Sequence, residues 1–140
     1  MSENNTNPIP VLSKPLLYSR LFKFRAWDGK EMLQDIIPMN NYAITRVQGL
    51  ENTMAYCYYV TVEKIMQYTG LKDKTGTDIY EGDLIVFEDK TKYVIIFKFG
   101  AFGFTNDFMS FIGLCESNLN ILQVIGNVYE NKNLLWDLQL

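Results

Sequence analysis

The stretch MQYTGLKDKTGTDIYEGDLIVFED, residues 66–89, places acids and glycines between short apolar runs. Glycine adopts positive φ angles without steric cost, and an aspartate side chain accepts hydrogen bonds from nearby backbone amides, so both are typical of tight turns. Asp73 with Gly76 predicts one hairpin turn, and Gly82 with Asp83 predicts the turn that leads into the next strand. We interpret these residues as parts of two solvated turns in a small β-barrel.

The segment that begins at residue 21 has the alternation of a β-strand. In LFKFRAW (21–27), apolar residues alternate with two cations and a tryptophan, which predicts a strand. The Asp-Gly pair at 28–29 predicts a tight hairpin turn. Residues 31–37 then predict the return strand, and we expect Pro38 and the asparagine pair at 40–41 to end it.

The remaining segments are less even in their patterns. Residues 42–53 show no clear pattern, whereas residues 54–71 are rich in β-branched and aromatic residues and predict two strands or one kinked strand. Residues 91–105 predict a long strand in which glycines mark a bulge or a sharp bend. Residues 120–130 predict another strand, and residues 131–140 predict a short helix that lays its leucines on the core.

Many short strands separated by Gly, Asn and Asp turns predict a mainly β fold with little helix. A strand entered through Gly-Asp is common in SH3-like barrels, so we expect an N-terminal β-hairpin region that leads into a C-terminal SH3-like small barrel. The expected organisation is a flexible polar tail over residues 1–15, an N-terminal β region over residues 16–62, and the barrel with its short C-terminal helix over residues 63–140.

The composition favours a folded protein outside the membrane. The chain has 140 residues, of which 48% are hydrophobic and 14% aromatic, enough to bury a core. No run approaches the ~20 apolar residues of a membrane span. The N-terminus lacks the apolar core of a signal peptide, so we expect a cytoplasmic protein. Cys57 and Cys115 are then expected to be small buried thiols rather than a disulfide.

The acids of the opening stretch do not fit a metal loop or a phosphate loop. Counted from Asp73, Gly76 is fourth and Asp78 is sixth, whereas an EF-hand loop has glycine at the sixth position. The terminal Gly-Lys-Ser/Thr of a P-loop is also missing. Glu81 and Asp83 would share one face of a strand, but nothing predicts the cleft that paired-carboxylate chemistry needs.

The chain contains no histidine, which excludes Ser-His-Asp and Cys-His nucleophile systems and every histidine-based metal site. We therefore expect no enzyme activity, no cofactor and no bound metal.

A basic strip lies near the front of this acidic chain. The net charge is −3, yet residues 14–30 carry five cations against one acid, so this strip has a balance of +4 and the rest of the chain carries −7. The candidate partner-binding residues are Arg20, Lys23, Arg25 and Trp27. Their cations and ring suit phosphate contacts with base stacking, or an acidic protein surface. The alternative is a solvated outer face of an antiparallel strand.

The aromatic residues exceed what one face of each strand in a small barrel can bury. We expect most of the series to be core and the remainder to form an exposed patch for self-association or for a partner. The series is Tyr56, Tyr58, Tyr59, Phe97, Phe99, Phe102 and Phe104.

Three blocks together resemble a known family. FKFRAWDGKEM (22–32), MQYTGLKDKTGTDIYEGDLI (66–85) and VIGNVYENKNLL (124–135) are similar, in this order, to the YopX-like proteins of bacteriophages and prophages. The resemblance implies a mostly β protein with a C-terminal SH3-type barrel, a phage or prophage origin and a bacterial cytoplasm. It implies no assigned activity, so no catalytic residue is carried over.

Three functions follow as hypotheses. The leading one is a small non-enzymatic module that binds a host or phage protein through the basic strip or through a barrel edge strand. The second is nucleic-acid binding by the basic strip, which predicts steep weakening with salt. The third is a carboxylate-dependent hydrolase or metal enzyme at Glu81 or Asp83. A membrane partner is not expected, and a homo-oligomer stays open.

Overall fold

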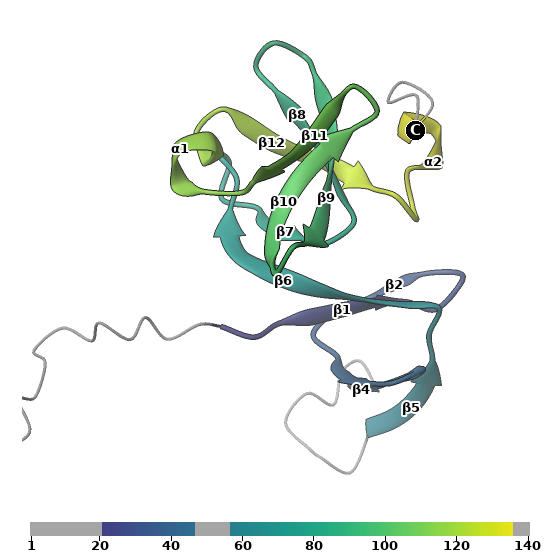
Figure 1. The fold of residues 1–140 in the computed structure, drawn as a ribbon. Helices are drawn as coiled ribbons and strands as arrows, with labels where there is room; N and C mark the ends of the chain where they lie inside the picture. The colour runs from purple at the N-terminus through teal and green to yellow at the C-terminus, as the bar shows by residue number, and fades with distance from the viewer. Residues whose placement is uncertain (1–20, 47–56, 136–140) are drawn as a thin grey trace, which may run out of the picture.

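The computed structural model describes residues 21–46 and 57–135. Within these ranges the chain is mainly β, as the sequence predicts, and its curled sheets form a half-barrel (Figure 1). The SH3-like detail and the domain boundaries stay predictions, and the predicted tail over residues 1–15 lies outside the described residues. No helix in the described ranges is long and apolar enough to cross a membrane.

The first sheet has four strands in the order β2-β1-β6-β7. Its predicted hairpin turn is confirmed, because Gly29 has a φ of +100° and Asp28 Oδ1 accepts hydrogen bonds from the N–H groups of Lys30 and Glu31. The predicted return strand is shorter than expected, since Asp35 adopts a φ of +49° and redirects the chain. The strands are β1 (Phe24–Trp27), β2 (Met32–Leu33), β6 (Lys64–Lys72) and β7 (Asp78–Tyr80).

The second sheet has three strands in the order β3-β4-β5. The expectation that Pro38 ends a strand is wrong, because Pro38 lies inside β3 and pairs with Ala43. An edge strand tolerates proline since one side of it needs no ladder hydrogen bond. The strand β4 falls in a segment for which the sequence predicted none. The strands are β3 (Ile37–Met39), β4 (Tyr42–Arg46) and β5 (Cys57–Thr61).

The third sheet has five strands in the order β11-β10-β9-β8-β12. The predicted long strand over residues 91–105 is a hairpin of two strands, which turns at Phe99 and Gly100, both with positive φ. The sequence predicted β12 but neither β11 nor the short helix α1 (Glu116–Leu119). The strands are β8 (Asp83–Phe87), β9 (Lys92–Lys98), β10 (Ala101–Asn106), β11 (Met109–Gly113) and β12 (Leu122–Asn127).

The main core lies inside the curl of the five-stranded sheet. The helix α2 (Lys132–Leu135) lies elsewhere: its Leu134 and Leu135 pack on a second core cluster, which contains Leu84 of β8 and Val94 of β9. The predicted C-terminal helix on the core is thus confirmed for its described residues. The buried residues of the main cluster are Ile79, Ile85, Tyr93, Ile95, Phe104 and Leu122.

One of two expectations about burial needs correction. Cys115 is exposed rather than buried, because it precedes α1 at the surface, where its Sγ lies 2.9 Å from Ser117 Oγ. The side chain of Cys57 lies outside the described residues. Of the aromatic series, Phe104 is core, whereas Phe97 and Phe99 are exposed. The tyrosine side chains at positions 56, 58 and 59 also lie outside the described residues.

Candidate functional site

The aspartate of the first predicted turn receives backbone N–H groups. Asp73 Oδ1 accepts hydrogen bonds from the N–H groups of Thr75 (2.8 Å) and Thr77 (2.9 Å), and its Oδ2 accepts one from Val124 on β12 (2.8 Å). Burial alone would raise the pKa of Asp73, but these bonds and the Thr75 hydroxyl hold that pKa below its ordinary value. The turn is confirmed; its predicted exposure is wrong, because Asp73 also ties the turn to β12 and is buried.

The aspartate of the second turn is 1% exposed, so this turn is not solvated either. Asp83 Oδ2 accepts a hydrogen bond from the N–H of Tyr80 (2.7 Å), and its Oδ1 pairs with Nη2 of Arg25 on β1 (2.6 Å). Burial raises the pKa of Asp83 to about 6, although the guanidinium of Arg25 acts in the opposite direction. Gly82 supplies the positive φ, +85°, that the turn needs.

Arg25 therefore links β1 of the four-stranded sheet to Asp83 at the start of β8 in the five-stranded sheet. Its guanidinium lies over the ring of Tyr80, 4.6 Å from the ring centroid. Its Nε is buried and has no hydrogen-bond partner within the described part of the chain. Burial of a guanidinium with one unsatisfied donor is tolerated only while a carboxylate compensates its charge. Loss of either Arg25 or Asp83 should therefore destabilise the fold by leaving the other charge buried and unpaired.

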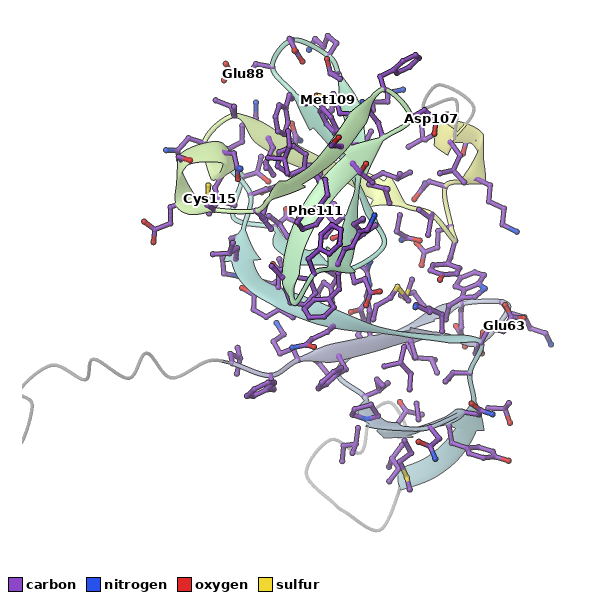
Figure 2. The ribbon with its side chains drawn as sticks, in the orientation of Figure 1. Glu63, Glu88, Asp107, Met109, Phe111 and Cys115 are labelled. Atoms are coloured by element: carbon purple, nitrogen blue, oxygen red, sulfur yellow. The ribbon has the colours of Figure 1, made fainter. Side chains whose placement is uncertain are left out.

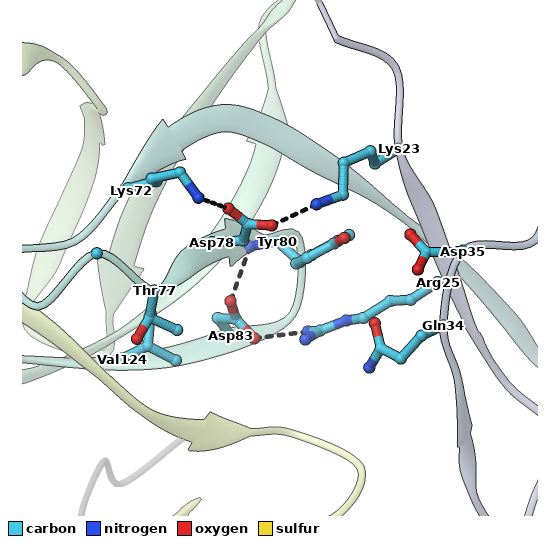
Figure 3. A pocket seen from close by; sticks show the side chains of 11 residues that line it. Lys23, Arg25, Gln34, Asp35, Lys72, Thr77, Asp78, Tyr80, Asp83 and Val124 are labelled. Atoms are coloured by element: carbon cyan, nitrogen blue, oxygen red, sulfur yellow. Dashed lines mark hydrogen bonds and ion pairs between the residues drawn. The ribbon is translucent and has the colours of Figure 1, made fainter.

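A pocket of about 440 Å³ opens above this pair, between β1, the segment that follows β2 and the β6–β7 hairpin (Figure 3). At its wall, Asp78 is held by Lys23, at 2.5 Å, and by Lys72. Burial alone would raise the pKa of Asp78, but the two ammonium groups hold it below its ordinary value, and Asp78 raises the pKa of both lysines.

The charges that line the pocket cancel. Three cations face three carboxylates, so the pocket has no surplus charge with which to concentrate an anion or a cation. The charged lining residues are Lys23, Arg25, Lys72, Asp35, Asp78 and Asp83. We therefore interpret the charged residues that line the pocket as structural: they hold β1 against β7 and β8.

The four predicted partner-binding residues do not form one exposed strip. Arg20 lies outside the described residues. Lys23 pairs with Asp78, and Arg25 is buried against Asp83 instead of facing solvent. Trp27 is half-buried and stacks on Tyr129, with ring centroids 5.9 Å apart. Their role in partner binding stays a prediction, with two of the cations already paired inside the chain.

The expected carboxylate pair is not assembled on one strand face. Glu81 lies in the turn before β8, with its carboxylate 3.6 Å from Lys64 Nζ, whereas Asp83 begins β8 and is buried. Among residues 21–46 and 57–135, no three acidic or cysteine side chains gather closely enough to hold a metal ion.

Among the described residues, β11 is the outermost strand of the five-stranded sheet, and it pairs only with β10. Leu114 N–H donates to Phe102 C=O (3.0 Å), and Ile112 pairs with Phe104. Because ladder bonds alternate along an antiparallel strand, the N–H and C=O of Gly113 and the C=O of Phe111 point away from β10. The C=O of Gly113 accepts a hydrogen bond from Asn118 Nδ2 (3.2 Å), which leaves the N–H of Gly113 and the C=O of Phe111 for another chain. These two remaining groups form the β11 edge, the name that we use below.

Apolar side chains flank this edge on both sides of the sheet. Phe111 covers Gly103 of β10, at which an added Cβ would lie 2.3 Å from the phenylalanine ring. Phe99, 82% exposed, meets Phe111 edge to face at 5.9 Å. Met109 and Ile112 are exposed near the inner side, and Phe108 is 76% exposed in the turn before β11. Figure 2 shows Phe111 on the front of the sheet and Met109 towards the far end of β11.

The family follows from comparison with known proteins. A model of the YopX protein family matches residues 23–136, which include the pocket and the β11 edge. The chain belongs to the YopX family. The resemblance seen in the three sequence blocks is thereby confirmed.

Solved structures agree with this YopX assignment. Protein EF1440 from Enterococcus faecalis is 28% identical with a TM-score of 0.59, and the match covers 84% of this chain and 99% of that one. Protein yopX from Bacillus subtilis is 20% identical with a TM-score of 0.53, over 80% and 96% of the two chains, and shows the shared fold. A comparison with curated proteins finds no match.

Proposed function

We propose that the chain is a non-enzymatic protein-binding module, which takes up an extended segment of a partner protein at the β11 edge. One observation carries the proposal: the N–H of Gly113 and the C=O of Phe111, which have no partner among residues 21–46 and 57–135, lie between apolar side chains that face solvent. The backbone groups would give a partner strand its hydrogen bonds, and the side chains would give it contact area on both faces. Proteins commonly protect an edge strand with charges, and β11 (MSFIG) carries none.

The basic strip supports this function less well than the edge does. Phosphate contacts and acidic partners both need cations that face outward, and Lys23 and Arg25 are paired within the chain. Nucleic-acid binding is therefore the outcome that the experiment below must separate from strand addition.

The setting of this proposal is a bacterial cytoplasm, with a host or phage protein as the partner. Its support is the similarity of the sequence blocks to bacteriophage and prophage proteins, together with the bacterial sources of the two similar structures.

Gly113 offers a matched pair of variants. A Cβ added at Gly113 meets no atom within 4 Å, and its φ lies outside the positive region. Gly113→Ala keeps the outward N–H, whereas Gly113→Pro removes it and places a ring where a partner strand would pair. Because this N–H makes no bond to β10, both variants should keep the fold.

The test is affinity capture from bacterial lysate with wild type, Gly113→Ala and Gly113→Pro, each with and without nuclease, read by mass spectrometry. We expect one protein to survive nuclease, to bind wild type and the alanine variant equally, and to fall by about tenfold on the proline variant. Equal capture by all three proteins would refute strand addition at this edge. Recovery of nucleic acid, with proteins lost on nuclease treatment, would support the alternative.

A further inference from the structure

The two ends of the β11 edge are acidic. Asp107 lies two residues before β11 and Glu116 three residues after it, and both side chains are exposed. Within the described part of the chain, neither carboxylate forms an ion pair. Figure 2 places Asp107 and the neighbour of Glu116, Cys115, at opposite ends of the strand.

No cation lies on the edge between these acids. Lys98 is on β9, which β10 separates from β11, and its ammonium lies over the ring of Phe99, 4.9 Å from the centroid. A segment paired with Gly113 would thus meet apolar side chains along its middle and a carboxylate at each end.

We infer that the occupant of the β11 edge is an extended segment of another protein with alternating apolar residues and a lysine or arginine at each end. This inference rests on the proposed function and names the chemistry of its partner. Complementary charges at the ends would fix the register of the added strand and speed its encounter, whereas the apolar middle would hold it.

A second copy of the chain fits the edge less well. Antiparallel pairing of two β11 strands about Ile112 would set Phe111 of one copy opposite Gly113 of the other, which is sterically acceptable. The same pairing would bring Asp107 of one copy towards Glu116 of the second copy at both ends. Like charges in such positions oppose association, and each copy carries a net charge of −3.

Two synthetic peptides test the charge preference. Both have the core Val-Thr-Ile-Thr-Val; one carries Lys-Arg at each end and the other carries Glu-Glu. Binding to wild type, to Gly113→Pro and to an Asp107→Asn, Glu116→Gln double variant is measured by fluorescence anisotropy at low and physiological salt. Amide exchange of Gly113, followed by NMR, reports whether the peptide occupies the edge, and light scattering reports self-association.

We expect the basic-ended peptide to bind wild type at least about tenfold more tightly at low salt, with the ratio shrinking as salt rises. The double variant should bring the ratio close to one, and Gly113→Pro should bind neither peptide. Equal binding of both peptides with slowed exchange at Gly113 would overturn the charge inference and leave strand addition standing. Binding that leaves exchange at Gly113 unchanged, or no binding at all, would overturn both. Self-association that slows exchange at Gly113 would show the second copy as the occupant.

Discussion

The turn region around Asp73 and Asp83 and the β11 edge use their polar groups in opposite ways. In the turn region, each carboxylate is matched inside the chain, by backbone N–H groups or by Arg25. Along the β11 edge, the N–H of Gly113 and the C=O of Phe111 have no partner within the described residues, and the ring of Phe99 is largely exposed to solvent. The carboxylates of residues 66–89, which form the most distinctive sequence pattern, thus stabilise the fold. The edge proposed to bind a partner has no comparable sequence pattern.

The largest expected effect comes from breaking the turn region at Arg25. Arg25→Met leaves the carboxylate of Asp83 buried without its countercharge, so we expect the free energy of unfolding at pH 7 to fall by about 3–5 kcal/mol. The loss should be smaller at pH 5, where Asp83 takes up a proton. Urea denaturation measures it, with Lys74→Met at an exposed position as the control. A loss under about 1 kcal/mol would show that the ion pair does not tie β1 to the barrel.

Removal of the Asp73 carboxylate should lower the free energy of unfolding by less than Arg25→Met does. Asp73→Ala takes the acceptor from the N–H groups of Thr75, Thr77 and Val124, and water can replace only part of it. We expect a loss of about 2–3 kcal/mol by urea denaturation. Asp89→Ala, which removes one acceptor in an exposed turn, should cost well under half as much. Equal losses would mean that burial of Asp73 adds nothing.

The fold should also be sensitive to changes where β11 contacts β10, at Gly103. In Gly103→Ala the new methyl would lie 2.3 Å from the ring of Phe111 and from the carbonyl of Ile112, so the strand must shift. Overpacking of this kind costs about 1–3 kcal/mol. Thermal unfolding measures the loss, and Gly113→Ala is the control on the neighbouring strand. An unchanged melting temperature would show that β11 moves aside without cost.

A smaller effect follows from the pKa of Asp83, which burial raises from its ordinary 3.8 to about 6. The folded state binds the proton of the Asp83 carboxyl group more tightly than the unfolded state does. The contribution of this proton to the free energy of unfolding is therefore complete below pH 3.8 and is lost as the pH rises through 6. Between pH 5 and pH 7 the free energy of unfolding should fall by about 1 kcal/mol. Asp73 and Asp78 have lowered pKa values and act outside this window. The side chain of Asp83→Asn cannot titrate, so this variant should not lose free energy of unfolding between pH 5 and pH 7. An identical loss in that variant would show that another group causes it.

The smallest effect on stability should be that of Gly113→Pro, within about 0.5 kcal/mol of wild type, because the N–H that it removes has no partner in the sheet. Its effect on partner capture should nevertheless be the largest of any single variant in β11. A proline variant that unfolds would show instead that Gly113 belongs to the sheet ladder.

Local chemistry made much of the fold predictable. The Asp28 hairpin, the turns at Gly76 and Gly82 and the strand β12 each depend on residue types within a few positions, so the sequence contains their cause. The strand β4 has no such pattern in its own residues, and it becomes a strand because β3 pairs with it through a tight hairpin on one side and β5 pairs with it on the other.

The candidate site was harder to predict for the same reason. Alternation showed that Arg25 shares a face with Lys23, but it could not show that Asp83, 58 positions away, packs against that face. The β11 edge is even harder to predict from local sequence, because a strand lies at an edge only through the order of all the strands in its sheet. The apolar run FMSFIGL at 108–114, directly after an Asn-Asp turn, was the one local signal of that strand.

The strand β6 pairs with β1 on one side and with β7 on the other (Figure 1). Phe24 lies opposite Gln67, so β1 leaves the ribosome long before the strand that completes its sheet. During synthesis Arg25 stays hydrated until β6 and then Asp83 have emerged, and only then does its charge become buried. The N-terminal hairpin is therefore synthesised well before the partner of Arg25, so a nascent chain cut short before Asp83 lacks the ion pair that joins β1 to β8.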